Sequence, residues 1–541
     1  MGKKVGIDLG TTYSCVSYLN ENGGLEVVRN QEGNNTTPSV VFFDTDGSTV
    51  VVGENARPSA AFAPDNLVER IKSQMGTKDY TINIMGNDYS PTAISSIILR
   101  KLKEDAEAHM GEPIEGCVIT CPAYFGTIAK AATLEAAKAA DLNVYSIINE
   151  PTAAAFAYTY IRHIDTDKTV LIYDLGGGTF DCTLLKINFV DGQQKVNVVA
   201  SNGDPFLGGK DWDDALIEYV VEEFCRITGA DPDEMKNDPE CKVSLSIDAE
   251  KNKKMLTARE SVKMKAEFNG EKQLIEITRD TFDSVTEPLL QKTISLVNAM
   301  FAKENRSIDE VDEIILVGGS TYMPQVAKCL EATYGKPLAQ FEPNEAVAKG
   351  AALMAAFSYA YDDGDPSATA QNAGDAQSGG TVPDAGNENQ GFTIKRPDGQ
   401  EIVVEDIINK SYGVKIFDEN EHKHLILNLL KVGTAKPCTG SNDGIMPLAI
   451  GTATHITVCE TDSKEDIVEY EESYDVYSGP LNVPQGLDPH TPVTVVFDLN
   501  MSGILAIKTV AAGIVTELVF DPTTGGATTE GVSQARKLQL G

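Results

Sequence analysis

Two short turns rich in glycine and threonine contain the residue types that bind phosphate. The first follows the apolar run VGIDL, and the second follows VLIYDL. Glycine lets backbone N–H groups approach phosphate oxygens closely, and threonine hydroxyls supply further donors. The first turn consists of Gly10, Thr11 and Thr12, and the second consists of Gly176, Gly177, Gly178 and Thr179. Together the two turns could hold the phosphates of one polyphosphate ligand.

An aspartate stands just before each of these turns, Asp8 before the first and Asp174 before the second. A bare carboxylate would repel phosphate, but it is well placed if a hydrated Mg²⁺ lies between the two groups. A third turn, with Gly318 and Gly319 in ILVGGSTYMP, would let the backbone approach a flat ligand closely. One such turn alone is typical of an ordinary hairpin. Three of them, two preceded by aspartate, favour a nucleotide site.

Two common kinds of nucleotide site are disfavoured by the sequence. There is no G-x-x-x-x-G-K-[ST] run, which a P-loop requires. There is also no G-x-G-x-x-G run opening a helix, which a dinucleotide-binding fold requires. The phosphate-binding arrangement is therefore of another kind.

The composition bears on partners and location. A net charge of −35 disfavours nucleic acid and anionic membrane surfaces as partners, because like charges repel. No uncharged apolar run reaches spanning length, and we expect no secretory signal in MGKKVGIDLG. Nine cysteines suit a reducing compartment, and Cys117 and Cys121 are expected to be buried thiols rather than zinc ligands. We therefore expect a cytoplasmic protein.

The elements that must position these turns fall into two architectures. The first 360 residues alternate β-rich runs with amphipathic helical stretches, whereas residues 400–521 alternate β-rich runs with turns. Residues 362–391 have almost no large apolar side chain, which predicts a disordered linker. The segments 5–16 and 170–185 echo each other as β-hairpins around Asp-Leu-Gly. Such an echo predicts a duplicated domain whose halves face each other across a ligand-binding cleft.

Longer motifs connect the chain with a known family. IDLGTT, YDLGGGTFD and VGGST resemble the phosphate and adenosine motifs of the actin-like ATPases. ITCPAYF (119–125) and INEPTAAAFAY (148–158) resemble the 70-kDa heat-shock (DnaK-like) chaperones, and this resemblance runs through residues 3–360.

The resemblance implies a fold with several parts. An α/β actin-like ATPase domain, built as a duplicated ribonuclease-H-like unit, should span residues 1–361. A flexible acidic linker is expected over 362–402, and an all-β sandwich that binds substrate over 403–521. We expect residues 522–541 to be a disordered tail, in a short, divergent member without the family's helical lid.

The resemblance also implies the roles of individual residues, with ATP or ADP, Mg²⁺ and K⁺ as ligands. Asp8, Glu150 and Asp174 should orient the waters around Mg²⁺, and Asp8 and Asp181 should hold K⁺. Lys72, Glu150, Asp174 and Thr179 are the expected catalytic residues, with Lys72 near the γ-phosphate. The nucleotide contacts implied are Gly10, Thr11, Thr12, Tyr13, Gly176, Gly177, Gly178, Thr179, Gly208, Gly209, Glu260, Lys263, Gly318, Gly319, Ser320 and Tyr322.

Several positions depart from the family pattern. Tyr322 stands where the family usually has an arginine, so an aromatic ring could replace a cation packed on the adenine; simple surface packing is the alternative reading. The other departures near the nucleotide are Asn344 for aspartate and Glu267 for serine.

Two further departures concern coupling between the domains. Pro122 and Glu150 match a family switch whose arginine is Lys130 here, which loses the bidentate guanidinium. Ser146 stands where an arginine usually meets a J-domain protein, so that partner would need a matching change.

The second half resembles the family more loosely. VVEDIINKSYG (403–413) resembles the interdomain linker, although Glu405 interrupts its apolar triplet and Asp406 keeps its acidic end. A β-sandwich here would bind an extended apolar peptide through backbone hydrogen bonds. The acidic stretch 461–475 could favour basic peptides, or it could be a solvated loop or edge strand.

Three functions follow from these expectations. The first is an ATP-dependent chaperone that hydrolyses ATP to ADP and phosphate and binds unfolded or extended polypeptides. Its partners would include a J-domain protein and a nucleotide-exchange factor. The second is a nucleotide-sensing adaptor with negligible turnover that recruits one protein partner. The third, an actin-like filament former, is disfavoured by the NEPTAAA match.

Overall fold

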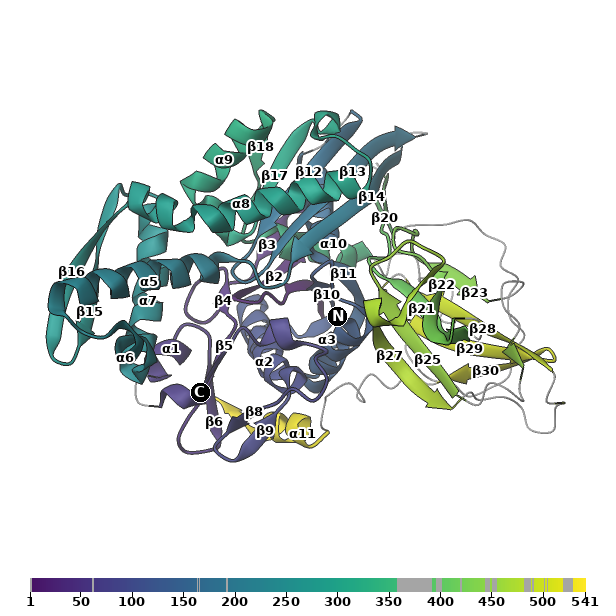
Figure 1. Ribbon diagram of the computed structural model, residues 1–541, viewed down its shortest axis with the longest axis horizontal. Helices are drawn as coiled ribbons and strands as arrows, with labels where there is room; N and C mark the ends of the chain where they lie inside the picture. The colour runs from purple at the N-terminus through teal and green to yellow at the C-terminus, as the bar shows by residue number, and fades with distance from the viewer. Residues whose placement is uncertain are drawn as a thin grey trace.

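Two lobes, each built on a mixed β-sheet with helices packed around it, form the larger part of the molecule, and a smaller β-rich unit lies beside them (Figure 1). The computed structural model describes residues 2–541 apart from 61–62, 163, 165, 191–192, 358–391, 396–400, 419–420, 443–447, 450–454, 481–487, 489–490, 501, 504 and 519–528. In this part of the chain, no helix is both long and apolar enough to cross a membrane.

The sheet of the first lobe has the order β11–β10–β1–β2–β3. Strands β1 and β2 form the predicted hairpin, and β1 also pairs in parallel with β10. The strands of this lobe are β1 (Lys3–Asp8), β2 (Tyr13–Leu19), β3 (Leu25–Val27), β4 (Thr37–Pro38), β5 (Val40–Phe43), β6 (Thr49–Val52), β7 (Leu67–Glu69), β8 (Ile82–Ile84), β9 (Asn87–Tyr89), β10 (Ile114–Cys121) and β11 (Val144–Asn149). Its helices are α1 (Ala56–Ser59), α2 (Pro91–Met110), α3 (Thr127–Ala139) and α4 (Glu150–Arg162).

The second lobe repeats the same hairpin with β12 and β13, and β12 pairs in parallel with β17. Its strands are β12 (Lys168–Leu175), β13 (Phe180–Val190), β14 (Gln193–Asp204), β15 (Ser261–Phe268), β16 (Glu271–Thr278), β17 (Glu313–Val317) and β18 (Leu338–Gln340). Its helices are α5 (Gly209–Thr228), α6 (Pro232–Asn237), α7 (Pro239–Leu256), α8 (Arg279–Lys303) and α9 (Pro324–Tyr334). The echo seen in the sequence is therefore a repeated structural unit.

Helix α10 (Ala346–Phe357) packs against α4 and β1 of the first lobe, and its buried side chains share one core cluster with Val170 and Ile315 of the second lobe. Its sequence AVAKGAALMAAF is rich in small residues. A Cβ on Gly350 would lie 1.8 Å from the carbonyl oxygen of Ala153, and a Cβ on Gly6 would lie 2.0 Å from the nitrogen of Ala352. These contacts require glycine, so the packing that places the two hairpins opposite each other depends on small side chains.

The smaller unit, which we call the β domain, contains two antiparallel sheets that share one core. The sheet orders are β26–β22–β21–β25–β27 and β23–β28–β29–β30, with β24 paired to β28. Val414 and Leu427 of the first sheet pack in one cluster with Phe497 and Ile507 of the second. The strands are β21 (Ser411–Asp418), β22 (Lys423–Leu430), β23 (Cys438–Ser441), β24 (Leu448–Ala449), β25 (His455–Thr461), β26 (Ile467–Glu469), β27 (Ser473–Pro480), β28 (Pro492–Leu499), β29 (Leu505–Ala511) and β30 (Ile514–Leu518).

The structure differs from the expected boundary between linker and β domain. Strands β19 (Phe392–Lys395) and β20 (Glu401–Glu405) extend the sheet of the second lobe, where β20 pairs in parallel with β14. Ile402 and Val404 are fully buried in that lobe because alternate residues of a strand face the same side. Part of the expected linker therefore belongs to strands, and the rest of it, 362–391 and 396–400, lies outside the described residues.

The structure also differs from the expected disordered tail. Residues 522–528 lie outside the described part, but helix α11 (Thr529–Lys537) and strand β31 (Gln539–Leu540) follow them. Both pack on the first lobe, where α11 lies against α2 and β31 pairs with β6 (Figure 1). Ala535 and Leu538 are buried in the core of that lobe, which explains why this polar segment is ordered.

Candidate functional site

A cavity of about 370 Å³ opens between the lobes, where the turn after β1 faces the turn after β12. Most of the residues predicted from the turns and motifs line it. They are Asp8, Gly10, Thr11, Thr12, Tyr13, Lys72, Glu150, Asp174, Gly176, Gly177, Thr179, Gly318, Gly319, Ser320 and Tyr322. The duplicated hairpins thus bring both phosphate-binding turns to one cavity.

The two turns approach each other too closely to carry larger side chains. A Cβ on Gly177 would lie 2.2 Å from Thr12 Oγ1, and a Cβ on Gly178 would lie 2.7 Å from Thr11 Cγ2. The Thr12 hydroxyl is buried, and among the described residues it has no hydrogen-bond partner. Burying a hydroxyl without a hydrogen-bond partner costs folding free energy. The position of the Thr12 hydroxyl on the cavity wall therefore fits a polar ligand, such as phosphate, that would supply the partner.

Lys72 is a buried cation on the wall of this cavity. It lies in a short 3₁₀ helix, Ile71–Gln74, and is 4% exposed. Its Nζ forms an ion pair with Glu150 at the start of α4. Burial alone would lower the pKa of Lys72, but the nearby carboxylates of Glu150 and Asp8 raise it above its usual value. The lysine is therefore held in its charged form.

The carboxylates of the cavity are crowded and mostly buried. Burial, followed by the charge of Glu150, raises the pKa of Asp8 to about 7, although Lys72 and a 3.0 Å hydrogen bond from Thr120 oppose the shift. Burial and the charges of Glu150, Asp181 and Asp8 raise the pKa of Asp174 well above its usual value. So many acids around one lysine favour a bound cation, because a cation restores the ionised carboxylates.

The donor set fits a hydrated Mg²⁺ better than a directly ligated metal. Among the residues that the structure describes, no three His, Cys, Asp or Glu side chains lie close enough together to bind a metal ion. Mg²⁺ usually keeps several waters and binds through one or two carboxylates and the phosphates of its nucleotide. Asp8, Glu150 and Asp174 could orient such waters.

Asp181, which we predicted as a K⁺ ligand, lies on β13 and is 3% exposed. Burial and the charge of Glu150 raise its pKa to about 8. It does not line the cavity, but it is paired directly with Asp174 across β12 and β13, and its charge raises the pKa of Asp174.

Gly208 and Gly209, which we predicted as nucleotide contacts, instead pack against the second glycine turn, on its side away from the cavity. The N–H of Gly209 donates to the Gly176 carbonyl at 2.9 Å, and the N–H of Lys210 donates to the Gly177 carbonyl at 2.8 Å. A Cβ on Gly208 would lie 2.4 Å from the nitrogen of Gly178. These three glycines, 178, 208 and 209, do not line the cavity but let α5 begin directly against its wall.

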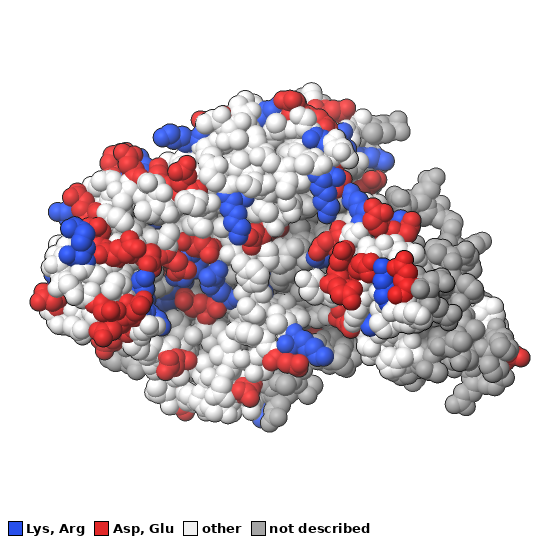
Figure 2. All heavy atoms as spheres, in the orientation of Figure 1, with Lys and Arg blue, Asp and Glu red and all other residues white. Residues whose placement is uncertain are grey.

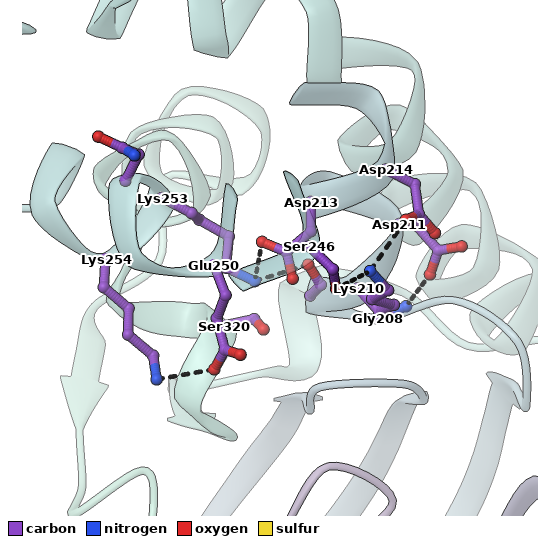
Figure 3. A network of polar contacts seen from close by, with 12 residues as sticks. Gly208, Lys210, Asp211, Asp213, Asp214, Ser246, Glu250, Lys253, Lys254 and Ser320 are labelled. Atoms are coloured by element: carbon purple, nitrogen blue, oxygen red, sulfur yellow. Dashed lines mark hydrogen bonds and ion pairs between the residues drawn. The ribbon is translucent and has the colours of Figure 1, made fainter. Parts of the chain in front are cut away.

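A network of charged groups fixes the start of α5 to α7 (Figure 3). The buried Lys253 Nζ lies 2.9 Å from Asp213 Oδ1 and donates to the Gly209 carbonyl at 2.7 Å. Lys210 Nζ lies 3.1 Å from Asp214 Oδ1 and donates to Ser246 Oγ at 3.1 Å. These contacts hold α7 beside the cavity.

The predicted contacts Glu260 and Lys263 do not line the cavity. The Glu260 side chain is 86% exposed and pairs with Arg279. Lys263 is exposed on β15, where Glu267 also lies on the surface between Lys265 and Lys272. This wall is formed instead by helix α7, through Ser246, Glu250, Lys253 and Lys254, and by Thr257, which follows the helix. The spacing of Glu250, Lys253, Lys254 and Thr257 places them on one side of a helix, but spacing alone does not distinguish a cavity wall from a solvated helix face.

An ion-pair cluster that the sequence analysis missed crosses the cavity. Arg57 of α1 lies 2.5 Å from Glu250 on α7 and 2.6 Å from Glu69 on β7. Tyr13 also donates to Glu250, and Lys254 donates to the Tyr13 hydroxyl at 2.7 Å. Burial would raise the pKa of Glu250, but Arg57 and Lys254 lower it to about 2. The cluster joins the outer parts of the two lobes.

The third glycine turn forms another part of the cavity wall. Gly318 has φ of 81°, and a Cβ there would lie 2.3 Å from the Leu175 carbonyl, so glycine is required. Ser320 donates to the Gly176 carbonyl at 2.8 Å, which ties this turn to the second one. Tyr322 is 44% exposed on the cavity wall, and Asn344 lies next to Gly319.

The β domain docks on the first lobe through Asp406. Asp406 Oδ2 lies 2.7 Å from Lys436 Nζ, and both side chains are almost fully buried. From the lobe, Asn149 donates to Asp406 at 2.9 Å and Thr152 donates at 3.3 Å. Asn149 directly precedes Glu150, so the docking contact adjoins the ion pair of the cavity.

The positions predicted to couple the domains lie in this interface. Ser146 Oγ lies 2.9 Å from Ser502 Oγ of the β domain. Lys130 is 5% exposed, and a Cβ on Gly503 would lie 2.6 Å from its Nζ. Burial and the charge of Lys436 lower the pKa of Lys130 to about 8.

Acidic side chains are spread over both lobes and the β domain on the face shown in Figure 2, and basic ones are interspersed among them. All nine cysteines are free, and Cys117 and Cys121 are buried on β10, as we expected.

Comparison with family models gives a match that covers most of the two lobes. The model described as "Hsp70 protein" matches residues 4–363, which is more than half of the chain. It covers the hairpins, the cavity and α10.

Proposed function

The chain belongs to the 70-kDa heat-shock protein family, and we propose that it is a chaperone that hydrolyses ATP to ADP and phosphate and binds extended polypeptides. Members of this family are ATP-dependent chaperones. The observation that carries the proposal is the cavity in which two glycine turns converge with the carboxylates of Asp8, Glu150 and Asp174 and with the buried Lys72. The nine free cysteines support action in a reducing compartment such as the cytoplasm.

In this proposal the chain's own residues bind and orient the nucleotide. Backbone N–H groups of the two turns, with Thr11, Thr12 and Thr179, bind phosphate oxygens. Bound Mg²⁺ would neutralise phosphate charge and hold the phosphates in position. Lys72, fixed by Glu150, stabilises negative charge on the transferring group and orients the attacking water.

The remaining ligand roles follow the family. We propose that Asp8, Glu150 and Asp174 hold the waters of Mg²⁺, and that Asp8 and Asp181 hold K⁺. The raised pKa values of Asp8 and Asp181 support a nearby cation, because burial and carboxylate charge alone disfavour their ionised forms. Tyr322 would pack on the adenine.

The β domain is the proposed peptide-binding part. Its sheets end in the edge strands β26, β27 and β30, whose backbone groups can pair with an extended peptide. Large apolar side chains are exposed on the same domain. They are Phe417, Ile467, Tyr474, Ile514 and Val515. A J-domain protein and a nucleotide-exchange factor would be its partners.

Single-turnover ATP hydrolysis, with and without an extended apolar peptide, tests the proposal. We expect bound ATP to be converted to ADP and phosphate, and we expect the peptide to change the rate. A charged peptide of equal length serves as the control. ATP binding without conversion, or conversion that no apolar peptide alters, would contradict the proposal.

One observation favours a second candidate, a nucleotide-sensing adaptor with negligible turnover. Ser146, where the family's arginine meets a J-domain protein, contacts Ser502 of the β domain instead. An adaptor would bind ATP without converting it in the same single-turnover experiment.

A further inference from the structure

The segment 529–541 follows the β domain in the sequence but packs on the first lobe. Figure 1 shows helix α11 in yellow beside β8 and β9, away from the β domain. Strand β31 lies parallel to β6, with Gln539 opposite Thr49 and Leu540 opposite Val50. The N–H of Gln539 donates to the Ser48 carbonyl at 2.8 Å, and that of Gly541 donates to the Val50 carbonyl at 2.9 Å. The segment therefore adds a strand to the edge of the small sheet β6–β5–β7.

Two arginines cap helix ends across the contact. Arg100 of α2 donates to the carbonyls of Ala535 and Arg536 in the last turn of α11, at 3.4 and 3.3 Å. Arg536 of α11 donates in turn to the carbonyls of Lys138 and Ala139 at the end of α3, at 2.9 and 3.1 Å. The last carbonyls of a helix have no partner within it, and cations are favoured there. Each arginine thus satisfies groups on another helix.

Apolar side chains complete the contact. Ala535 is 1% exposed and Leu538 is 9% exposed, and both belong to the core of the first lobe. Val532 and Leu540 pack against the same core. Backbone pairing, helix capping and burial of apolar side chains all bind the segment, so it is an integral part of the first lobe.

The small sheet held by this segment also carries one half of the ion-pair cluster across the cavity. Strand β6 leads directly into α1, which packs on β5 and carries Arg57. Glu69 lies on β7 of the same sheet, and Arg57 joins it to Glu250 on α7. The segment ties this sheet to α2 and α3 on its other side. The segment therefore connects α2 and α3 to the sheet β6–β5–β7 and to α1, whose Arg57 contacts the second lobe.

We propose that residues 529–541 are a strap that restrains opening of the cavity and so slows the release of bound nucleotide. The proposal rests on the proposed function, because it requires nucleotide in the cavity. With the strap detached, the sheet β6–β5–β7 and Arg57 move more freely against α2. The Arg57–Glu250 contact then breaks more often, and nucleotide leaves faster.

Release of a fluorescent ADP analogue, chased with excess ATP, tests the strap in the full chain. Leu538→Asp places a charge in the core contact, and a chain lacking residues 529–541 removes the strap entirely. We expect both to release the analogue about fivefold faster, which corresponds to roughly 1 kcal/mol off the release barrier. Lys537→Ala changes an exposed neighbour on the same helix and should release at the wild-type rate.

Two further measurements distinguish loss of the strap contact from general destabilisation of the protein as the cause of faster release. Amide hydrogen exchange over residues 49–52 should be faster in Leu538→Asp, since β6 loses its neighbour. Arg57→Ala should itself speed release, and adding Leu538→Asp to it should have little further effect, because both act through one contact.

The outcomes distinguish the two proposals. A chain lacking 529–541 that binds the analogue and releases it at the wild-type rate would overturn the strap. A full additive effect of Leu538→Asp in the Arg57→Ala background would also contradict it. Failure of the wild-type protein to bind the analogue would instead contradict the proposed nucleotide site.

Discussion

Lys72 and Lys130 are both buried lysines, yet their surroundings shift their pKa values in opposite directions. Glu150 and Asp8 outweigh the effect of burial at Lys72 and raise its pKa. At Lys130, burial and the charge of Lys436 outweigh Asp406 and lower the pKa to about 8. Lys72 is therefore a permanent cation, whereas Lys130 can lose its proton in the interface.

Docking of the β domain should consequently depend on pH. In the closed interface the pKa of Lys130 is about 8, and we expect it to rise toward the ordinary lysine value of 10.5 when the interface opens, because Lys436 then moves away and water reaches the side chain. Between these values the undocked form binds more protons, so docking strengthens as pH rises from about 8 to 10. Energy transfer between dyes on the lobe and the β domain measures this.

Lys130→Met supplies the control, because it keeps much of the side-chain volume but cannot titrate. Docking of the β domain in Lys130→Met should therefore not strengthen as pH rises from about 8 to 10. An equal rise in docking with pH in Lys130→Met and wild type would show that Lys130 is not the group responsible.

The phosphate side of the site was predictable from local sequence, but the α7 side was not. Each glycine turn carries its own aspartate and threonines, so residues close in the chain are close in the cavity. Glu250 and Lys254 reach the cavity only because α7 packs beside α5, and nothing in their local sequence distinguishes them from solvated helix charges. Glu260, which we predicted instead, follows the end of this helix and faces solvent.

At the scale of elements, β20 and α11 show how short segments acquire structure from their neighbours. Neither has enough apolar area to fold alone. We expected the end of a linker and the start of the β domain where β20 lies, and a disordered tail where α11 lies. Ile402 and Val404 become buried only because the edge of β14 is open to them. Hairpins such as β1–β2 and β12–β13 were predictable because both strands and the turn are contiguous.

Ile402→Asp tests the docking of β20. The change buries a charge beneath the sheet of the second lobe. It should weaken the pairing of β20 with β14 by at least about 3 kcal/mol. Hydrogen exchange over residues 402–405 should rise strongly, and proteases should cleave nearby. Glu405→Gln, on the same strand but partly exposed, should leave both unchanged. Unaltered exchange in Ile402→Asp would contradict this pairing.

At the scale of the whole molecule, the buried pair Asp406–Lys436 links the β domain to the cavity. Asp406 accepts hydrogen bonds from Asn149 and Thr152, next to Glu150. Lys72, Glu150 and Asn149 thus form a continuous path from the cavity to the β domain. The resemblance implied coupling through Glu150, but the Asp406–Lys436 pair and its contacts with Asn149 and Thr152 were not predicted, because they join residues far apart in the chain.

Asp406→Asn should loosen the docked arrangement. It leaves Lys436 buried without its counter-ion, which typically costs about 3–5 kcal/mol. Small-angle scattering should report a larger radius of gyration than for wild type. As a control, Asp462→Asn removes an exposed partner of Lys410. Exposed ion pairs contribute about 0–1 kcal/mol, so the scattering profile of this variant should match that of wild type. An unchanged profile for Asp406→Asn would show that this pair does not hold the domains together.

The central claim is that the cavity hydrolyses ATP with Lys72 as its fixed cation. Single-turnover hydrolysis by Lys72→Ala tests it most directly, with ATP affinity measured alongside and with Lys78→Ala, an exposed lysine outside the cavity, as the control. We predict that Lys72→Ala slows hydrolysis at least about 100-fold while ATP still binds, and that Lys78→Ala behaves as wild type. Hydrolysis by Lys72→Ala at the wild-type rate would contradict the claim.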